Sequence, residues 1–334
     1  MAYSPAHRSR QFFMTAVSLD DIVTVLRETE RDGLRSDRLS EGLSGLSGAR
    51  TVGLLQRLAA LYETEPDTCY LEVGVFQGLT LVCAALEAPT LPCFGIDNFA
   101  TLDPGGENLG IVTGRIAKFG VANARLINTD FEVALEGLGA HIGDRRVGVY
   151  FVDGPHDYRS QLVCLTLAQP WLHENAVIVI DDANYPDVRW STRDFLLAFP
   201  EYRLLFDSYS PDHPANLDTE LKPEFEAAWL NGIQILVRDP EGRLASMTPP
   251  VAEKERDLYL NEWLAHRLRL AELAPDALAL ADAIVQQDSA KEAEIRQRLI
   301  DGYNRDRETF DRRHADRNVY SAGLPQSRFN PRLG

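Results

Sequence analysis

From residue 68 onwards, short apolar runs alternate with amphipathic segments of helical length. The apolar runs cover residues 69–74, 92–97, 124–130, 147–153 and 176–182. The segments with helical spacing cover roughly residues 79–87, 109–120, 131–139, 158–172 and 187–199. Strands that alternate with helices in this order predict an α/β fold, in which a mostly parallel sheet carries helices on both faces. Two further β-like runs, at 202–209 and 232–239, extend the predicted sheet. The proline-containing linker between these two runs is long enough to cover a site.

The flanking parts of the chain have helical rather than β patterns. Ser18 is a suitable N-cap for a helix over 19–34, and a second helix is predicted over 49–64. After Pro249 the chain becomes helical over 251–273, and Pro275 is predicted to begin a helix that runs to about residue 313. The tail from Ala315 has an irregular pattern. We therefore expect three parts: an N-terminal helical arm or lid (1–65), a sheet domain (66–240), and a helical C-terminal extension with an irregular tail (241–334).

Composition and charge narrow the class of protein. The 334 residues are 45% hydrophobic and 25% charged, which is typical of a soluble globular chain. The net charge of −16 argues against nucleic-acid and anionic membrane partners, because both need Lys and Arg. The four cysteines form no CxxC pair and lie in apolar runs, as expected for reduced, buried thiols. Without a signal-peptide pattern or a run long enough to span a membrane, we expect a cytoplasmic protein.

A glycine turn follows the first predicted strand. Glu72 comes before Gly74, and Gly78 lies four residues further on, where a helix begins. Two glycines between a strand and a helix allow a ligand to approach the backbone closely. The spacing differs from the dinucleotide fingerprint, and the acid before the turn suits a ligand with a positive group. The alternative interpretation of the two glycines is a tight structural turn.

The next two strands also end in acids. The second ends at Asp97, followed by Asn98, and the third ends at Asp130 and Phe131. An acid at the end of the second strand can accept hydrogen bonds from the hydroxyls of a ribose. An acid followed by an aromatic residue can recognise a purine. Acids at these positions also cap the following helices, which is the structural alternative.

Three carboxylates are predicted to meet at the same edge of the sheet. Asp153 ends the fourth strand, and Asp181 and Asp182 end the fifth. Because like charges that crowd together need a cation or a proton between them, these residues predict a divalent metal site. An all-oxygen donor set suits Mg²⁺, with Mn²⁺ or Ca²⁺ as alternatives. The structural alternative is that these acids cap a helix and stabilise a turn.

The order of these motifs resembles that of class I S-adenosylmethionine-dependent methyltransferases. The resemblance rests on YLEVGVFQG, GIDNF, NTD, VDGPHDY and VIDD, and it covers roughly residues 66–240. The most similar subgroup is the metal-dependent small-molecule O-methyltransferases that act on macrolide and aminocoumarin sugars, with the catechol type more distant. The resemblance implies a Rossmann-like seven-stranded sheet whose last strand is antiparallel, and a role in natural-product biosynthesis.

The same resemblance assigns roles to the strand-end residues. It implies that Glu72, Gly74 and Gly78 flank the methionine part of S-adenosylmethionine. It places Asp97, with Asn98 beside it, at the ribose, and Asp130 with Phe131 at the adenine. It also gives Asp153, Asp181 and Asp182 the ligand spacing of the metal-dependent subgroups.

A base must still accept the proton of the methylated hydroxyl. The best candidate is His156, three residues after Asp153, because histidine titrates near neutral pH. Asp157 is a second candidate, and the catechol type has a lysine at the position of His156. We therefore expect a metal-assisted O-methyltransferase acting on a sugar, diol or phenol, and a homo-oligomer formed through the helical extensions. Two alternatives stay open: a metal-independent enzyme that uses His156 as base, and a non-catalytic scaffold subunit.

Overall fold

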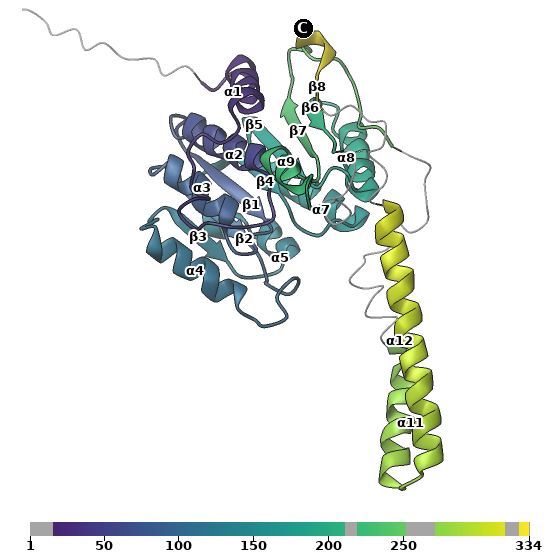
Figure 1. Ribbon diagram of the computed structural model, residues 1–334. Helices are drawn as coiled ribbons and strands as arrows, with labels where there is room; N and C mark the ends of the chain where they lie inside the picture. Colours follow the sequence, from purple (N-terminus) through teal and green to yellow (C-terminus); the bar gives the residue numbers. More distant parts are fainter. Residues whose placement is uncertain (1–15, 211–218, 252–270, 318–326, 334) are drawn as a thin grey trace, which may run out of the picture.

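The computed structural model describes residues 16–210, 219–251, 271–317 and 327–333. Within these ranges, eight strands form one sheet in the order β3-β2-β1-β4-β5-β7-β6-β8 (Figure 1). Their bounds are β1 Thr68–Val73, β2 Cys93–Ile96, β3 Ala124–Ile127, β4 Arg146–Val152, β5 Leu172–Asp181, β6 Tyr202–Ser208, β7 Ile233–Arg238 and β8 Ser327–Phe329. Strands β1 to β5 are mutually parallel, whereas β7 runs antiparallel to both β5 and β6. The predicted α/β class and the reversed strand are confirmed.

Helices cover both faces of the sheet, because alternate strand residues are apolar towards each side. One core cluster joins the sheet to α1, α2, α3 and α4, and the other joins it to α5, α6, α7 and α8. The bounds are α1 Leu19–Asp32, α2 Ala49–Tyr62, α3 Leu79–Glu87, α4 Asn108–Lys118, α5 Phe131–Glu136, α6 Gly139–Ile142, α7 Tyr158–Ala168 and α8 Pro186–Ala198. Helix α1 begins at the predicted cap, with a complete capping box between Ser18 and Asp21. The three layers place the carboxyl ends of β1 to β5 along one edge.

The expected count of seven strands is one too low. Residues 327–329, in the tail that the pattern predicts to be irregular, form β8 and pair antiparallel with β6. Arg328 forms an ion pair with the fully buried Asp207, and the Asn330 side chain donates hydrogen bonds to the carbonyls of Leu204 and Ala245. A three-residue strand is too short for its pattern to be recognised, and these contacts are formed with residues far away in the sequence.

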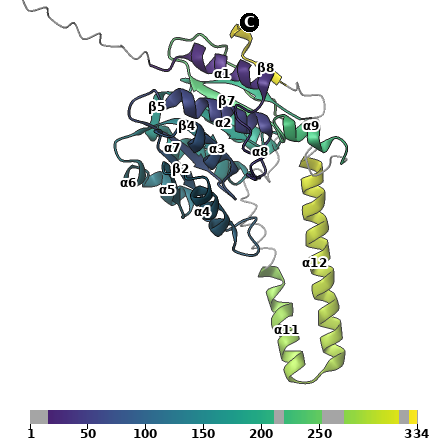
Figure 2. The ribbon, with the colours of Figure 1, turned by 60° about the vertical axis from the view of Figure 1, so that its left-hand side comes forward.

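The helical extension is a hairpin of two helices rather than one long helix. Helix α11 (Ala274–Val285) starts near Pro275 as predicted, but the chain turns at Gln287, where φ is +57°. Helix α12 (Ser289–Arg317) then runs back beside α11. Figures 1 and 2 show that the hairpin projects away from the three-layer part of the molecule.

Some predicted segments fall on residues that the structure does not describe, and one differs in detail from its prediction. Three parts of the prediction lie outside the described residues: residues 1–15 of the N-terminal arm, most of the helical stretch predicted over 251–273, and residues 211–218 of the proline-containing linker. The end of that linker forms a short helix, α9 (Lys222–Ala227). All four cysteines are free and buried, as predicted. Within the described part of the chain, the helices are too short or too polar to cross a membrane.

Candidate active site

Two carboxylates and one imidazole meet at the carboxyl edge of the sheet. Asp153 follows β4, Asp182 follows β5, and His156 lies in the loop before α7. Each of the three offers one ligand atom within 4.8 Å of the other two. All three side chains are partly exposed, so a small ligand can reach them. The structure therefore brings together the predicted base and two of the three predicted metal ligands.

The imidazole of His156 is held from two sides. Its Nε2 lies 2.7 Å from Oδ2 of Asp182, and its ring stacks on Tyr185 with centroids 5.2 Å apart. Asp182 has a left-handed backbone, with φ of +56°, and its other oxygen accepts a 2.6 Å hydrogen bond from Nδ2 of Asn231. The strained Asp182 is thus fixed in place by neighbouring side chains.

Asn231 is a supporting residue that the sequence analysis does not find. It lies just before β7, and its carbonyl also accepts a hydrogen bond from the Asn184 amide. Because β7 is antiparallel to β5, its first residues lie at the carboxyl edge of the parallel strands. The reversed direction of the predicted last strand is the one signal that could place Asn231 near the site.

Asp181, the third predicted metal ligand, is placed differently from the other two. It is buried, and its Oδ1 accepts a 3.0 Å hydrogen bond from the Asp182 backbone amide. It does not belong to the group formed by Asp153, His156 and Asp182. Burial raises the pKa of Asp181, and its hydrogen bond to the Ser47 hydroxyl offsets a small part of that rise. Asp181 is therefore not among the side chains that lie together, and His156 is the third member of that group.

The carboxylates of this edge raise one another's pKa values. Burial, followed by the charges of Asp181 and Asp182, raises the pKa of Asp153 well above its usual range. Burial and the charge of Asp182 do the same to the pKa of Asp181. A cation would relieve this repulsion. The two carboxylates are oxygen ligands that suit Mg²⁺ or Mn²⁺, so they fit the predicted ion, whereas an imidazole is not a preferred ligand of Mg²⁺.

Glu72 lies one strand away, fully buried in β1. One of its oxygens accepts a 2.6 Å hydrogen bond from the Tyr70 hydroxyl, whereas its other oxygen, Oε1, has no hydrogen-bond partner. Burial raises the pKa of Glu72 to about 8. A buried carboxylate oxygen without a partner is costly unless a ligand completes its hydrogen bonding. The predicted interaction with a positively charged group is consistent with this geometry.

The two glycines of the turn are required by close contacts. At Gly74, φ is +92°, and a Cβ atom would lie 1.8 Å from the carbonyl oxygen of Asp153. At Gly78, φ is +81°, and a Cβ atom would lie 2.5 Å from Cγ2 of Val112. Gly74 therefore lets the end of β1 lie directly against the end of β4, where the metal-ligand candidates begin.

Asp97 holds the glycine turn in place. Its Oδ2 accepts hydrogen bonds from the amides of Val75 and Phe76, and its Oδ1 accepts one from the amide of Phe99. Asn98 is exposed and closes a local turn by accepting from the amide of Ala100. The ribose-binding role of Asp97 stays a prediction, and a ribose hydroxyl would have to share oxygens that already accept from the backbone.

The remaining candidates lie at helix starts. Asp130 is exposed and caps α5 by accepting a hydrogen bond from the Glu132 amide, while Phe131 is half-buried on the core. Asp157 is buried and caps α7 through the amide of Ser160. That position gives Asp157 a structural role rather than the role of a second base. The adenine-binding roles of Asp130 and Phe131 stay predictions.

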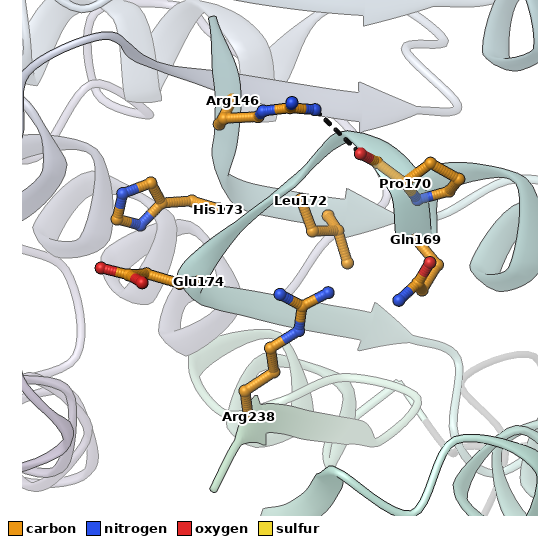
Figure 3. Close-up of a pocket in the computed structure, with 7 residues that line it drawn as sticks. All are labelled: Arg146, Gln169, Pro170, Leu172, His173, Glu174 and Arg238. Carbon is orange, nitrogen blue, oxygen red and sulfur yellow. Dashed lines mark hydrogen bonds between the residues drawn. The ribbon is translucent and has the colours of Figure 1, made fainter. Parts of the chain in front are cut away.

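A separate open pocket of about 460 Å³ lies at the amino ends of the parallel strands (Figure 3). It is lined by Arg146, Gln169, Pro170, Leu172, His173, Glu174 and Arg238. Arg146 begins β4 and Leu172 begins β5, so this pocket opens at the opposite edge of the sheet from Asp153 and Asp182. It is therefore distinct from the candidate site.

Comparison with protein families identifies the segment that carries the site. Residues 71–183 match a family model described as a methyltransferase domain. This segment of the chain is similar to that domain. Its matched range includes all predicted site residues, from Glu72 to Asp182, and the resemblance found in the sequence is confirmed at this level. A search of curated proteins gives no match.

Several solved structures are also similar to this chain at low sequence identity. An O-methyltransferase from Bacillus cereus in complex with SAH is 11% identical, with a TM-score of 0.45, over 68% of this chain and 94% of that one. The O-methyltransferase TomG from Streptomyces achromogenes is 15% identical, with a TM-score of 0.43, over 67% and 92% of the chains. The calicheamicin methyltransferase CalS11 is 13% identical, with a TM-score of 0.42, over 72% and 100%. Scores in this range describe a partial likeness.

Proposed function

We propose that this protein transfers a methyl group from S-adenosylmethionine to a hydroxyl of a small molecule, with the help of a divalent cation. One observation carries the proposal: the glycine turn of β1 and the acidic end of β4 are in direct contact. The Asp153 amide donates a 2.9 Å hydrogen bond to the carbonyl of Val73, and Gly74 leaves room for the Asp153 carbonyl. A methyl donor held at the glycine turn and a methyl acceptor held at Asp153 would therefore be neighbours.

The cofactor half of the site consists of residues from β1, β2 and β3. Glu72 has the unpartnered buried oxygen that a positively charged ligand would satisfy. Gly74 and Gly78 keep side-chain atoms away from the turn, while Asp97 fixes its backbone. Asp97 with Asn98 would contact the ribose, and Asp130 with Phe131 would contact the adenine.

The metal half of the site consists of Asp153, Asp182 and His156, and the buried Asp181 comes directly before Asp182. Asp153 and Asp182 would hold Mg²⁺ or another divalent cation, which would lower the pKa of a substrate hydroxyl and orient its oxygen towards the methyl group. His156, beside these two carboxylates, would accept the proton that the hydroxyl loses. Asn231 and Tyr185 hold Asp182 and His156 in place before any ligand binds. A substrate with two adjacent oxygens, such as a sugar, a vicinal diol or a phenol with a neighbouring hydroxyl, fits this arrangement best. The free, buried thiols suit an enzyme of the reducing cytoplasm, and a role in natural-product biosynthesis is part of this proposal.

One observation favours a second candidate function, methyl transfer without a metal. His156 Nε2 and Asp182 Oδ2 lie 2.7 Å apart, the arrangement in which a carboxylate orients an imidazole base. In that case His156 accepts the proton of the substrate hydroxyl directly, and Asp182 stabilises the imidazolium that forms. The two functions differ in whether a divalent cation activates the hydroxyl before His156 accepts its proton.

The test measures release of S-adenosylhomocysteine from S-adenosylmethionine with a panel of sugars, diols and phenols. We expect turnover with Mg²⁺ that is lost in EDTA, restored by added Mg²⁺, and abolished in Asp182→Ala and Asp153→Ala. Calorimetry should show that both variants still bind S-adenosylhomocysteine, and Asp144→Ala, an exposed acid outside the site, serves as the control. Turnover that persists in EDTA but is lost in His156→Ala supports the metal-independent enzyme. A wild-type protein that binds no S-adenosylhomocysteine contradicts both candidates and favours a scaffold.

A further inference from the structure

The pocket at the amino ends of the parallel strands carries positive charge in an acidic protein. Two of its seven lining residues are arginines, Arg146 and Arg238, and one, Glu174, is an acid. The whole chain, in contrast, has 34 basic and 50 acidic residues. A recess lined by one sign of charge concentrates ligands of the opposite sign. The composition of this lining therefore points to an anionic ligand.

Arg238 is held in a fixed orientation by Tyr202. It ends β7 and pairs with Tyr202 of β6 across the antiparallel ladder. Its Nε donates a 2.9 Å hydrogen bond to the Tyr202 hydroxyl, and its guanidinium lies over the Tyr202 ring, 5.1 Å from the centroid. Among the described residues, neither Nη1 nor Nη2 has a hydrogen-bond partner. The N–H groups of these two nitrogens can therefore donate to a ligand while the side chain stays where it is.

Arg146 lies on the other side of the same space. It begins β4, whose next residue pairs with Leu172 at the start of β5, and its Nη1 donates a 2.9 Å hydrogen bond to the Pro170 carbonyl. Figure 3 shows the two guanidinium groups on opposite sides of Leu172, whereas the Glu174 carboxylate points away from both. Within the described part of the chain, neither guanidinium is paired with a carboxylate. Two cations thus face one recess with no counter-ion from these parts of the chain.

We propose that this pocket binds a small organic anion with two negative charges, a phosphate monoester or a dicarboxylate, between Arg146 and Arg238. A guanidinium donates two parallel hydrogen bonds to the oxygens of either group, which is the chemistry that the two ligand classes share. The volume of about 460 Å³ is that of a small-molecule pocket and is larger than an inorganic ion needs. Leu172 and Pro170 give the body of the ligand an apolar wall, and Gln169 adds an amide to it.

This site is independent of the proposed methyl transfer. Arg146 and Leu172 begin the two strands whose other ends lead to Asp153 and Asp182, so the pocket and the candidate active site lie at opposite edges of the sheet. No residue of the candidate active site lines the pocket. The anion site can therefore be tested without a methyl donor and without a divalent cation.

The first test is calorimetry of the full chain at low ionic strength in EDTA, with phenyl phosphate, phthalate and inorganic phosphate as probes. We expect one molecule of phenyl phosphate or of phthalate to bind per chain, with a Kd below about 1 mM. The tighter of these two probes identifies the class of anion that the pocket prefers. Binding of neither probe overturns the proposal. Inorganic phosphate that binds as tightly as phenyl phosphate overturns the claim of an organic ligand, because the apolar wall would then contribute nothing.

The second test assigns the binding to the two arginines. We expect Arg238→Met and Arg146→Met each to weaken binding about 10- to 100-fold, and Arg238→Lys to weaken it about 10-fold, since lysine keeps the charge but loses the planar fork. Arg145→Met is the matched control, because Arg145 is also exposed, directly precedes Arg146 and does not line the pocket. Equal weakening by Arg145→Met would mean that only net charge matters, and it would overturn the site.

Two controls keep this result readable. Thermal unfolding checks that each variant is folded, and Arg146→Met still tests the site if the loss of the Tyr202 contact destabilises Arg238→Met. Asp182→Ala separates the pocket from the candidate active site, and we expect it to bind the anion as wild type does. Binding that is lost in Asp182→Ala but kept in both arginine variants would place the anion in the active site and would overturn the proposal.

Discussion

Gly74 is predicted to be the position where one added methyl group most directly disturbs the site. The substitution Gly74→Ala places a Cβ atom 1.8 Å from the Asp153 carbonyl oxygen and 2.5 Å from its carbon. To reach an ordinary contact, the ends of β1 and β4 must separate by more than about 1 Å. Asp153 is a proposed metal ligand, so this movement changes the geometry of the ion site.

The chain offers a matched control for the backbone cost. Gly42 has φ of +95°, almost the same as the +92° of Gly74, but its nearest neighbour would be Lys118 Nζ at 3.6 Å. The left-handed backbone costs alanine about 1–2 kcal/mol at either position. Overpacking adds about 1–3 kcal/mol at Gly74 alone. For a domain of this size, the extra term corresponds to a melting temperature about 2–12 °C lower than that of Gly42→Ala.

The assay combines thermal unfolding with Mn²⁺ binding and turnover. We expect Gly42→Ala to keep both functions, and Gly74→Ala to lose about 100-fold in turnover, the usual effect of a displacement of about 1 Å at a reacting centre. If Gly74→Ala matches Gly42→Ala in stability and in Mn²⁺ binding, then the ends of β1 and β4 are not in direct contact, and the proposed geometry of the site is refuted.

Three further predictions concern single residues. Asn231→Ala removes the hydrogen-bond donor to Asp182 Oδ1, and it should weaken Mn²⁺ binding about 10-fold, measured by titration. Unchanged Mn²⁺ binding would mean that Asn231 does not hold Asp182 in position. Glu72 has a pKa raised by burial to about 8, so its contribution to stability is complete below about pH 4.5 and is lost as the pH rises through 8. The difference in unfolding free energy between wild type and Glu72→Gln should therefore change over that range, and a difference that stays flat would contradict the pKa shift. Arg328→Ala leaves Asp207 buried without its cation and should cost about 2 kcal/mol in chemical denaturation, less than a fully buried pair because the guanidinium is partly exposed. Asp207→Asn in the same chain should recover part of that loss, and no recovery would mean that the ion pair is not the cause.

The parallel sheet could be predicted because its strands are apolar runs separated by helices of regular spacing. Asp97, Asp130, Asp153 and Asp182 could be found because strand ends at the carboxyl edge are defined by sequence order alone. By contrast, the different placement of the neighbours Asp181 and Asp182 could not be predicted, because it involves a left-handed backbone at Asp182. An aspartate with φ of +56° leaves no signal in a hydrophobic pattern.

Other features escaped prediction because they depend on contacts between distant segments. Asn231 reaches the site because β7 is reversed, and β8 exists because Arg328 finds the buried Asp207. The chain turn at Gln287 escaped prediction because residues 275–313 keep a helical composition throughout. Asp97 lies at a strand end as predicted, but its structural role differs from the predicted helix cap, because its oxygens accept hydrogen bonds from the amides of Val75, Phe76 and Phe99.

We propose above all that Asp153 and Asp182 hold a divalent cation beside His156 and the glycine turn of β1. The most direct measurement is Mn²⁺ binding followed by electron paramagnetic resonance, with wild type, Asp153→Ala, Asp182→Ala and the exposed control Asp144→Ala. The structure predicts one bound Mn²⁺ per chain in wild type and in the control, and none in the two site variants. Equal Mn²⁺ binding in all four proteins, or no binding in wild type, would contradict the claim.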